Sequence, residues 1–522
     1  MGQSNRVRPN VGVDVNRDNF IRTLYTHEWD VIIIGGGATG LGCAVDSASR
    51  GYKTLLLEQH DFAKATSSRS TKLIHGGVRY LQQGNIKLVR EALYERSRLY
   101  QNAPHLVHHL PFLVPLYHWW ETPFYTVGLK IYDMLAGKMG LEPSKHLTRR
   151  QTLNAVPNLH KEGLRGGVLY YDGQFDDARL AISLAQTAAR EGATVLNYFR
   201  VTALIKKKGK IVGVKAIDEL SKTKHVITAK VVINATGIFS DSIQKMDKPK
   251  SPSSIVPSQG VHIVLPASFL RSETAILIPH TDDGRVIFLV PWHGRVLLGT
   301  TDTPLKKPAL EPHALTKEID FLLHHAARYL TKPPTKADIL SHFAGIRPLV
   351  KEKKAHKTSA LSRDHVITVS PAGLVTIAGG KWTTYRKMAE DTIDQAIRTA
   401  QLPPRPCTTQ TLKLYGHMKG LDPQNLLTVY GSDLKKIPRR QKPLVPHLPY
   451  TLAHIQWALD NEMACTLEDV LSRRIRLLLL DARAALNIAP IVAHFMARHL
   501  KKTKSWEHSQ LKSFTQLAKR YL

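Results

Sequence analysis

The stretch WDVIIIGGGATGLGCAVDSASRGYKTLLLE, residues 29–58, decides the fold that this chain is expected to adopt. Residues 31–34 are only Val and Ile, a continuous apolar run that is typical of a strand buried on both faces of a parallel sheet. Small residues over 40–50 favour a helix, and KTLLLE over 53–58 favours a second buried strand. The order of these segments predicts a βαβ unit.

Three glycines, Gly35, Gly37 and Gly40, lie between the first strand and the helix, and Glu58 closes the second strand. The first glycine permits a tight turn, the second lets backbone N–H groups approach a pyrophosphate, and the third lets the helix pack closely on the strand. The helix N-terminus turns the positive end of its dipole toward the anion. Glu58 can accept hydrogen bonds from a pair of ribose hydroxyls. This context predicts a dinucleotide site.

Composition narrows the class of protein. The chain has 522 residues, 43% of them hydrophobic and 22% charged, which excludes wholesale disorder and a coiled coil. Three cysteines without a Cys-x-x-Cys pair argue against a disulfide framework or a thiolate zinc site, and we expect no metal. The formal net charge of +31 attracts phosphates, acidic lipid or nucleic acid. No run of about twenty apolar residues is present, so a membrane contact would be peripheral.

A second glycine pair bears on the choice between FAD and NAD. Gly379 and Gly380 follow the strand-like run 374–378 and precede a helical pattern over 383–400. A helix that points its N-terminus at a flavin would stabilise negative charge on the reduced ring. The run VINATG, 232–237, ends another strand in a turn of small residues that can approach a cofactor closely. Together these features favour a flavoprotein.

Long signatures spread over the chain resemble the FAD-dependent, quinone-linked glycerol-3-phosphate dehydrogenases of bacteria and mitochondria. They are GGGATG (35–40), TSSRSTKLIHGGVRYL (66–81), YYDGQFDDAR (170–179), GVHIVLP (260–266), DGRVIFLVPW (283–292), GTTDTP (299–304), GIRPLV (345–350) and AGGKWTTYR (378–386). The sequence is nearest to the mitochondrial type, but it contains no EF-hand loop, so calcium regulation is not expected. The resemblance implies oxidation of sn-glycerol 3-phosphate to dihydroxyacetone phosphate, with electrons passed to ubiquinone or menaquinone.

The strand pattern and the resemblance together predict an α/β fold in three parts. A Rossmann-like FAD-binding domain is expected from the discontinuous segments 26–105, 165–254 and 340–400. A mixed α+β substrate or cap domain is expected from 106–164 and 255–339. Because LPPRP at 402–406 cannot continue a helix, a C-terminal α-helical domain is expected over 401–522, with helical spacing clearest at 467–486.

The cofactor residues extend beyond the first glycine turn. The hydroxyls of residues 66–68 can bond a pyrophosphate or ribityl chain, and they can equally cap the next helix. Val201 lies where the family's adenine-contacting strand falls. The expected cofactor-binding set is Gly35, Gly37, Gly40, Glu58, Thr66, Ser67, Ser68, His75, Val201, Gly237, Gly380 and Thr383.

The substrate phosphate requires cations, preferably arginine, whose planar fork matches phosphate oxygens. Arg79, Arg347 and Lys381 lie within family signatures, each after an expected strand end or glycine turn, so we expect them to converge. Tyr80 and Thr300 are the expected hydrogen-bonding positions for substrate oxygens.

The reaction also needs a base for the hydroxyl proton while a hydride moves to flavin N5. His262 is the candidate, because imidazole takes up protons near neutral pH. His75, beside two glycines, is its rival and could instead pack against the flavin. The expected catalytic set is therefore His262, Arg347 and Lys381.

An aromatic insertion over 112–132 mixes Trp, Tyr and Phe with Lys130 and His118. This composition is typical of an interfacial membrane anchor, and equally of a buried core. The basic tail over 500–522 would add attraction to an anionic membrane surface. We expect a peripheral protein on the cytoplasmic face of a bacterial inner membrane, with the mitochondrial inner membrane as the alternative. A homodimer is one option for its oligomeric state.

Two rival functions stay open on the sequence. A flavin-dependent amine or amino-acid oxidase of the same fold would use arginine for a carboxylate and would reduce oxygen. An RNA-binding flavoprotein would account for the charge of +31. The sequence contains no recognised RNA-binding module, so no specific nucleic-acid partner is expected.

Overall fold

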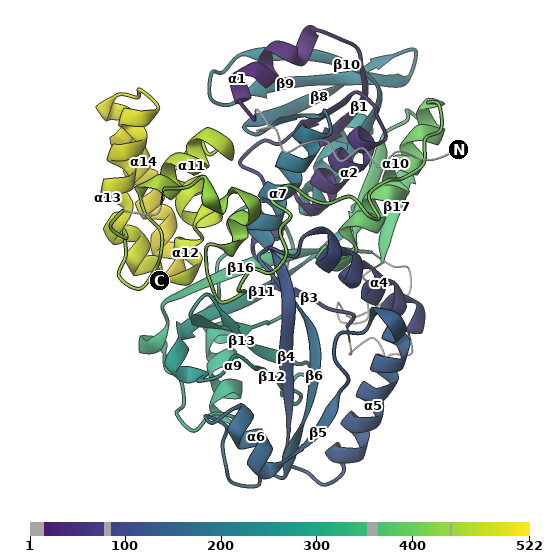
Figure 1. The fold of residues 1–522 in the computed structure, drawn as a ribbon. Coiled ribbons are helices and arrows are strands. Elements are labelled where there is room, and N and C mark those ends of the chain that lie inside the picture. The colour runs from purple at the N-terminus through teal and green to yellow at the C-terminus, as the bar shows by residue number, and fades with distance from the viewer. Residues whose placement is uncertain (1–14, 78–84, 352–363, 439–440) are drawn as a thin grey trace.

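The computed structural model describes residues 15–77, 85–351, 364–438 and 441–522. Figure 1 shows two sheets, one above the other, with the C-terminal helices at one side. The short helix α1 (Arg17–Arg22) precedes the first strand of the upper sheet. Each sheet is assembled from segments that are far apart in sequence.

The first sheet is built around strand β1 (Trp29–Ile34), which pairs in parallel with β2 (Thr54–Leu57) on one side and β10 (Lys224–Asn234) on the other. An antiparallel pair, β8 (Phe199–Lys207) and β9 (Lys210–Asp218), extends β10. The strand order is β17-β18-β10-β1-β2-β7. Its remaining strands are β7 (Thr194–Leu196), β17 (His365–Val369) and β18 (Val375–Gly379).

Both faces of β1 are covered, which explains its unbroken apolar run. Val31 and Ile33 pack in one cluster with helices α2 (Ala38–Ser49), α7 (Asp177–Arg190) and α10 (Tyr385–Ala400). Ile32 and Ile34 pack in another cluster with the β8–β9 layer and helix α8 (Ser240–Asp247). The predicted βαβ unit is therefore confirmed, with α2 crossing from β1 to β2.

The second sheet has ten strands in the order β15-β11-β14-β13-β12-β4-β6-β3, with β16 paired to β11 and β5 paired to β6. Strands β11, β13 and β14 lie within 255–339, a segment that the sequence assigns to the mixed α+β domain. The ten strands are β3 (Leu73–Ile74), β4 (Val107–Leu116), β5 (Lys145–Thr148), β6 (Gly166–Phe175), β11 (Ile255–Pro266), β12 (Ala275–Ile278), β13 (Ile287–Trp292), β14 (Arg295–Gly299), β15 (Thr303–Pro304) and β16 (Ser341–Val350).

The sheet membership differs from the expected domain boundaries at two long strands. The boundaries placed β6 and β16 with the nucleotide-binding segments, but both strands belong to the second sheet. The reason is long-range pairing, since β6 pairs with β4 over ten residues and β16 pairs with β11 over ten. Such a ladder joins segments far apart in the chain, and nothing local in the sequence marks it.

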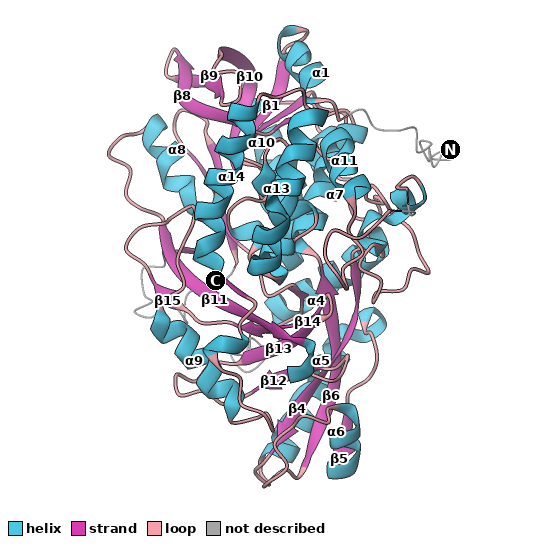
Figure 2. Cartoon of the chain, turned by 90° about the vertical axis from the view of Figure 1, so that its left-hand side faces the viewer, coloured by secondary structure: helices cyan, strands magenta, loops and turns pink. Residues whose placement is uncertain are grey.

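Helices cover both faces of the second sheet. Residues of α9 (Thr316–Ala327) and of the turn after α6 (Arg149–Ala155) cluster with Ile263 and Leu265 of β11. The C-terminal helices cluster on the opposite side with Val264. These are α11 (Leu452–Asn461), α12 (Leu477–Leu480), α13 (Ala482–His499) and α14 (Lys504–Ala518). Figure 2 shows α13 and α14 on the face turned toward the viewer.

The helical pattern predicted over 467–486 is interrupted. A π-helical turn spans Asp469–Arg474, and Arg476 then adopts a positive φ of 58°. Asp481 begins α13 by accepting a hydrogen bond from the backbone N–H of Ala484. The apolar spacing is helical throughout, but a left-handed residue and an N-cap divide it, and neither has a strong signal inside an apolar run.

Helices α4 (Ile86–Asn102) and α5 (Glu121–Ala136) lie beside the second sheet (Figure 1). The aromatic insertion over 112–132 divides between the two expected roles. Phe112 and Tyr132 are buried, whereas Trp119, Trp120 and Phe124 are exposed. Within the described ranges, none of the helices combines the length and apolar character needed to cross a bilayer.

Three histidines, two of them buried and one partly buried, make the stability of the fold sensitive to acid. Burial lowers the pKa of His105 to about 3, and those of His108 and His454 to about 4, from the ordinary value of 6.5. Below pH 6.5 these histidines bind protons in the unfolded chain but stay unprotonated in the folded chain. Between pH 6.5 and 4, we expect each of these histidines to lower the unfolding free energy by up to about 1.4 kcal/mol for every unit by which the pH falls.

Thermal midpoints measured from pH 7.5 to 4.5 test this expectation. His108→Gln keeps a donor for Gln174, whose Oε1 lies 2.8 Å from His108 Nε2, and should make the fall with pH shallower. A midpoint that does not change over this range would contradict it.

Candidate functional site

A cavity of about 570 Å³ lies where the two sheets meet. The first sheet contributes residues at the carboxyl ends of its parallel strands, including Ile34, Leu57 and Ala378. The second sheet contributes His262 from β11 and Arg347 from β16. The carboxyl edge of a parallel sheet is the usual place for a ligand, because helix N-termini and loops gather there.

The first glycine turn forms one wall. Gly35 has a φ of +110°, and a Cβ there would lie 2.7 Å from the carbonyl oxygen of Ala235. A Cβ on Gly40 would collide with the carbonyl oxygen of Gly35, so only glycine lets α2 approach β1 this closely. Gly37 lines the cavity as the N-cap of α2. The positive end of the helix dipole therefore meets the cavity, as a pyrophosphate requires.

Glu58 lies at the end of β2 and lines the same cavity. Its carboxylate accepts hydrogen bonds from the backbone N–H groups of Gly36 (2.7 Å) and His60 (2.9 Å). Burial raises the pKa of Glu58, and these two N–H groups oppose that rise. A carboxylate has about four acceptor positions, so the remaining lone pairs are available to ribose hydroxyls.

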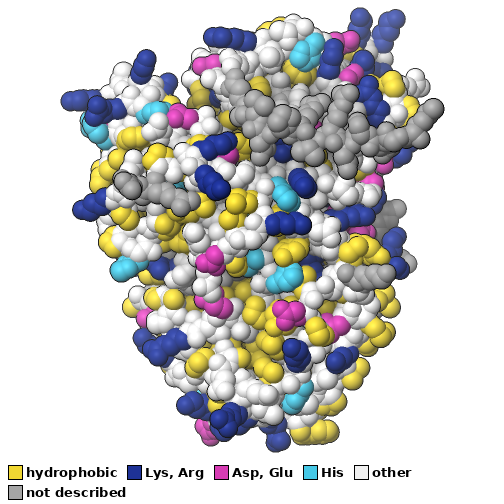
Figure 3. Space-filling view, in the orientation of Figure 1, with side chains coloured by type: hydrophobic (Ala, Val, Ile, Leu, Met, Phe, Trp, Pro, Cys, Tyr) yellow, Lys and Arg dark blue, Asp and Glu magenta, His cyan; other side chains and the backbone are white. Residues whose placement is uncertain are grey.

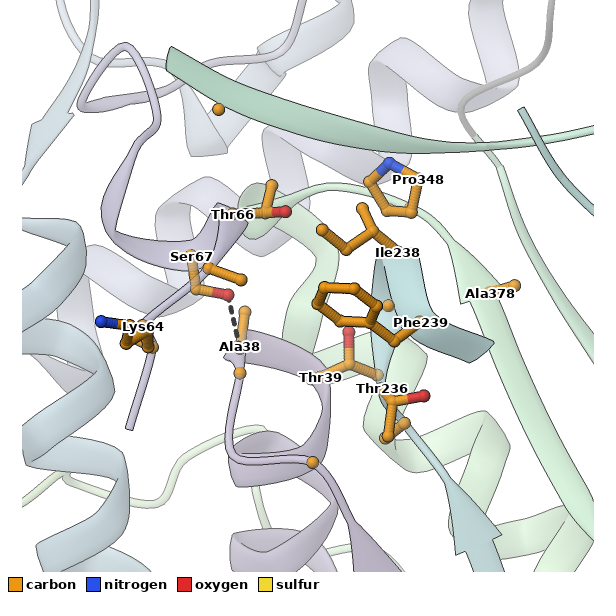
Figure 4. Close-up of a pocket in the computed structure, with 18 of the residues that line it drawn as sticks. Ala38, Thr39, Lys64, Thr66, Ser67, Thr236, Ile238, Phe239, Pro348 and Ala378 are labelled. Carbon is orange, nitrogen blue, oxygen red and sulfur yellow. Dashed lines mark hydrogen bonds between the residues drawn. The ribbon is translucent and has the colours of Figure 1, made fainter. Parts of the chain in front are cut away.

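Ser67 and Thr66 lie beside the start of α2. The backbone N–H of Ala38 donates to Ser67 Oγ at 3.0 Å, and Trp382 Nε1 donates to the carbonyl oxygen of Ser67 at 2.9 Å. Thr66 Oγ1 donates to the carbonyl oxygen of Ile346 at 2.7 Å, which ties this loop to the second sheet. Figure 4 shows Ser67 and Ala38 across the cavity from Ile238 and Phe239.

The structure places the remaining cofactor candidates in two groups. Most of them line the cavity: Gly35, Gly37, Glu58, Thr66, Ser67, His75, Val201, Gly237, Gly380 and Thr383. Gly40 and Ser68 are not among its lining residues: Gly40 serves helix packing, and Ser68 is buried with its carbonyl oxygen accepting from Lys72 Nζ. A cradle of glycines, a helix N-terminus and an acidic strand end thus fits an adenine dinucleotide.

Arg347 is oriented by the connection between β14 and β15. Its guanidinium donates to Thr300 Oγ1 at 3.1 Å, to the carbonyl oxygen of Thr301 at 3.0 Å and to Asp302 Oδ1 at 3.2 Å. A side chain on Gly260 would occupy the space of this guanidinium. Thr300 itself does not line the cavity and contacts Arg347 instead.

His262 is buried against the cavity wall. Its ring stacks on Phe343 with centroids 5.0 Å apart, and its Nε2 lies 2.9 Å from Thr71 Oγ1. Burial, followed by the nearby charges of Arg347 and Lys72, lowers the pKa of His262 well below its usual value. The imidazole is therefore neutral at neutral pH and can accept a proton.

Two of the three expected cations meet at this cavity. Lys381 lines it together with Arg347, although 34 positions in sequence separate them. Arg79 and Tyr80 lie outside the described residues. The candidate base and two candidate phosphate ligands thus share one cavity with the dinucleotide cradle.

Sequence reasoning missed several cavity residues. Phe239 and Pro348 supply apolar surface, Leu310 comes from the loop before α9, and Thr71 contacts His262. Pro348 lies within the motif GIRPLV and Phe239 lies two residues after the motif VINATG, so both positions had a usable signal. No local sequence pattern predicts that Leu310 lines the cavity, because its position depends on how the loop folds back.

The comparisons with known proteins agree with this geometry. Residues 30–386 match the family described as FAD dependent oxidoreductase, and residues 374–507 match that described as C-terminal domain of alpha-glycerophosphate oxidase. The chain is 42% identical to mitochondrial glycerol-3-phosphate dehydrogenase of Mesocricetus auratus over 94% of this chain and 73% of that protein.

Solved structures give the same result for the fold. Glycerol-3-phosphate dehydrogenase from Bacillus halodurans, complexed with FAD, matches with a TM-score of 0.80 and 31% identity, and the match covers 98% of each chain. Glycine oxidase from Geobacillus kaustophilus matches with a TM-score of 0.54 and 20% identity over 75% of this chain and 100% of its own, a likeness of fold alone. The predicted α/β fold with a helical C-terminal domain is confirmed.

A buried ion-pair cluster connects the cavity wall to the C-terminal helices. Asp61 accepts hydrogen bonds from Arg473 Nε at 2.6 Å and from Arg474 at 2.7 and 2.9 Å, and all three side chains are buried. Their charges hold the pKa of Asp61 well below its usual range. Lys64 of the same segment lines the cavity and pairs with Glu468 at 2.5 Å.

Removing the Asp61 charge should therefore damage both stability and cofactor binding. Asp61→Asn leaves two buried guanidinium groups short of a counter-charge, at an expected cost of about 3–5 kcal/mol. Denaturant unfolding and FAD titration measure the two effects. Glu219→Gln, which removes the carboxylate partner of the exposed Lys222, is the control, and it should cost less than about 1 kcal/mol. Equal stability of the two variants would contradict the role of Asp61.

Proposed function

Since this chain belongs to the family of FAD-dependent glycerol-3-phosphate dehydrogenases, we propose that it oxidises sn-glycerol 3-phosphate to dihydroxyacetone phosphate. It is a flavoprotein oxidoreductase with FAD as its cofactor. The observation that carries the substrate assignment is the presence of Arg347, Lys381 and His262 in the cavity that holds the dinucleotide cradle. Only a likeness of fold supports the amine-oxidase alternative. Only the net charge of the chain supports the RNA-binding alternative.

The cofactor is held by the first sheet. The turn at Gly35 to Gly37 and the first turn of α2 receive the pyrophosphate, and Glu58 receives the adenosine ribose. When bound, FAD accepts a hydride from the carbinol carbon of the substrate. Gly380 and Thr383 line the cavity just before α10, so the N-terminal dipole of that helix also begins at the cavity wall.

The substrate phosphate is held by Arg347 and Lys381. The guanidinium places a positive charge at the cavity wall, and its contacts with Thr300 and Asp302 keep its plane fixed. Lysine adds a positive point charge that tolerates several phosphate orientations. Arg79 and Tyr80 stay predicted substrate contacts.

His262 takes up the proton of the substrate hydroxyl. Oxidation of the secondary alcohol breaks its C–H and O–H bonds, and the proton needs an acceptor as the carbonyl forms. His262 fits this role because it lines the cavity together with Arg347 and Lys381, and its lowered pKa leaves the ring unprotonated at neutral pH. The alternative base, His75, also lines the cavity, and its backbone carbonyl oxygen accepts from Thr383 Oγ1 at 3.4 Å.

The electrons leave to a membrane quinone, ubiquinone or menaquinone. Contact with a membrane is supported by an apolar stripe on α5. The stripe consists of exposed residues at helical spacing: Phe124, Val127, Ile131 and Met134. Trp119 precedes them and is 73% exposed, and Met134 is 78% exposed. Figure 3 shows hydrophobic side chains along the lower right-hand side, where α5 lies in Figure 1.

Such a stripe fits an interfacial helix that lies in the headgroup region. Peripheral attachment to an inner membrane, bacterial or mitochondrial, follows from this proposal. The basic residues of the tail over 500–522 add attraction to anionic lipid.

Substrate binding by Arg347 is tested by anaerobic reduction of the flavin with sn-glycerol 3-phosphate. Arg347→Ala should raise the KM for this substrate roughly 10- to 100-fold, the value of one or two charge-assisted hydrogen bonds. Arg150→Ala removes an exposed arginine of α6 and should leave the KM unchanged. If Arg347→Ala binds the substrate as the wild type does, the phosphate assignment is wrong.

Membrane attachment is tested by sedimentation with phosphatidylglycerol vesicles. Replacing Phe124, Ile131 and Met134 by serine removes exposed apolar area and should weaken binding at least tenfold, while reduction of the flavin by substrate persists. The control replaces three exposed apolar residues of other elements, Leu220, Val226 and Ile491. Equal vesicle binding by both triple variants would exclude α5 as the membrane face.

A further inference from the structure

Thr71 holds one nitrogen of the His262 imidazole. Its Oγ1 lies 2.9 Å from His262 Nε2, and both residues line the cavity with Arg347 and Lys381. The ring is otherwise enclosed, because it stacks on Phe343 and a side chain on Gly299 would collide with it. Within the described part of the chain, His262 Nδ1 has no hydrogen-bond partner. The contact with Thr71 therefore sets which way the imidazole is turned.

The backbone next to Thr71 is anchored on both sides by one carboxylate. Ser70 donates to Asp177 Oδ2 from its N–H at 3.0 Å and from its hydroxyl at 2.8 Å. Lys72 Nζ donates to both oxygens of Asp177, at 2.6 and 2.7 Å. Lys72 and Asp177 are buried, so Thr71 has little freedom to move away from His262.

Lys72 also has an unusual backbone. Its φ of +63° lies in the left-handed region, which is uncommon for a residue with a side chain. Its carbonyl oxygen accepts from the backbone N–H of Phe175 at 3.0 Å, and its ammonium lies over the rings of Trp292 and Phe343, 5.1 and 5.4 Å from their centroids. A conformation of this kind persists only where its surroundings determine it, and here it follows directly after Thr71.

A hydroxyl suits a nitrogen that changes its protonation state. It donates to an unprotonated ring nitrogen and accepts from a protonated one, and it needs only to rotate about its C–O bond. Without it, a buried imidazolium N–H would have no acceptor, which penalises the charged form more than the neutral form. The Thr71 hydroxyl therefore favours proton uptake by the ring.

We propose that Thr71 relays the substrate proton to His262: its hydroxyl gives its own proton to Nε2 as it takes up the proton of the substrate hydroxyl, and it then accepts from the Nε2–H so formed. The inference rests on the proposed function, in which the hydroxyl proton of the substrate passes to His262 as the hydride passes to FAD. The ion pair of Lys72 with Asp177 fixes the segment that carries this hydroxyl. Thr71 acts on the rate of oxidation and leaves phosphate binding to Arg347 and Lys381.

Stopped-flow reduction of the bound flavin by sn-glycerol 3-phosphate without oxygen tests the role, since it separates the limiting rate from substrate affinity. Thr71→Val should lower the limiting rate roughly 10- to 100-fold with an unchanged dissociation constant. Thr71→Ser, which keeps the hydroxyl, should restore the rate to within a few-fold of the wild type. Thr71→Ala, a second variant without the hydroxyl, should match Thr71→Val.

The matched control is Thr316→Val, the same substitution at an exposed residue at the start of α9. FAD content and thermal midpoint verify that each variant is folded. Equal limiting rates in Thr71→Val and the wild type, or equal losses in Thr71→Val and Thr71→Ser, would overturn the inference while the proposed function stands. A wild-type flavin that stays oxidised with the substrate would overturn the proposed function and this inference with it.

Discussion

The close approach of helix α2 to the end of strand β1 is the constraint on which the rest of the site depends. A side chain at Gly40 would collide with the carbonyl oxygen of Gly35, and one at Gly37 would come within 3.1 Å of Ser67 Oγ. Because these positions lack a Cβ, the first turn of α2 presents its backbone N–H groups and the positive end of its dipole to the cavity. The backbone of the site alone therefore favours binding of an anion, without any contribution from charged side chains.

The side chains proposed to bind and oxidise the substrate come mainly from the second sheet. Arg347 and His262 lie on strands that pair with each other, β16 and β11, and they reach the cavity only because the second sheet meets the first at that edge. Buried ion pairs hold this arrangement, and Asp61 joins Arg474 across 413 positions of sequence. Such pairs contribute little net stability compared with apolar packing, but separating the partners is costly, so they specify a geometry.

The sequence predicts those parts of the site that depend on local pattern. The βαβ unit, the glycine turn and Glu58 follow from periodicity and spacing, whereas Arg347 and Lys381 needed the family resemblance, because a single cation in a basic chain has no local signature. The sheet membership of β6 and the contact of Thr71 with His262 were not predictable. Both depend on pairing between distant segments, and exposure of one face of α5 likewise depends on what the other face packs against.

A crystal structure of the protein with FAD and dihydroxyacetone phosphate would test the proposed site most directly. We predict that the pyrophosphate lies at the start of α2, the isoalloxazine ring beside His262, and the ligand's phosphate in hydrogen-bonding range of Arg347 and Lys381. A flavin bound elsewhere, or a phosphate that neither cation contacts, would contradict it.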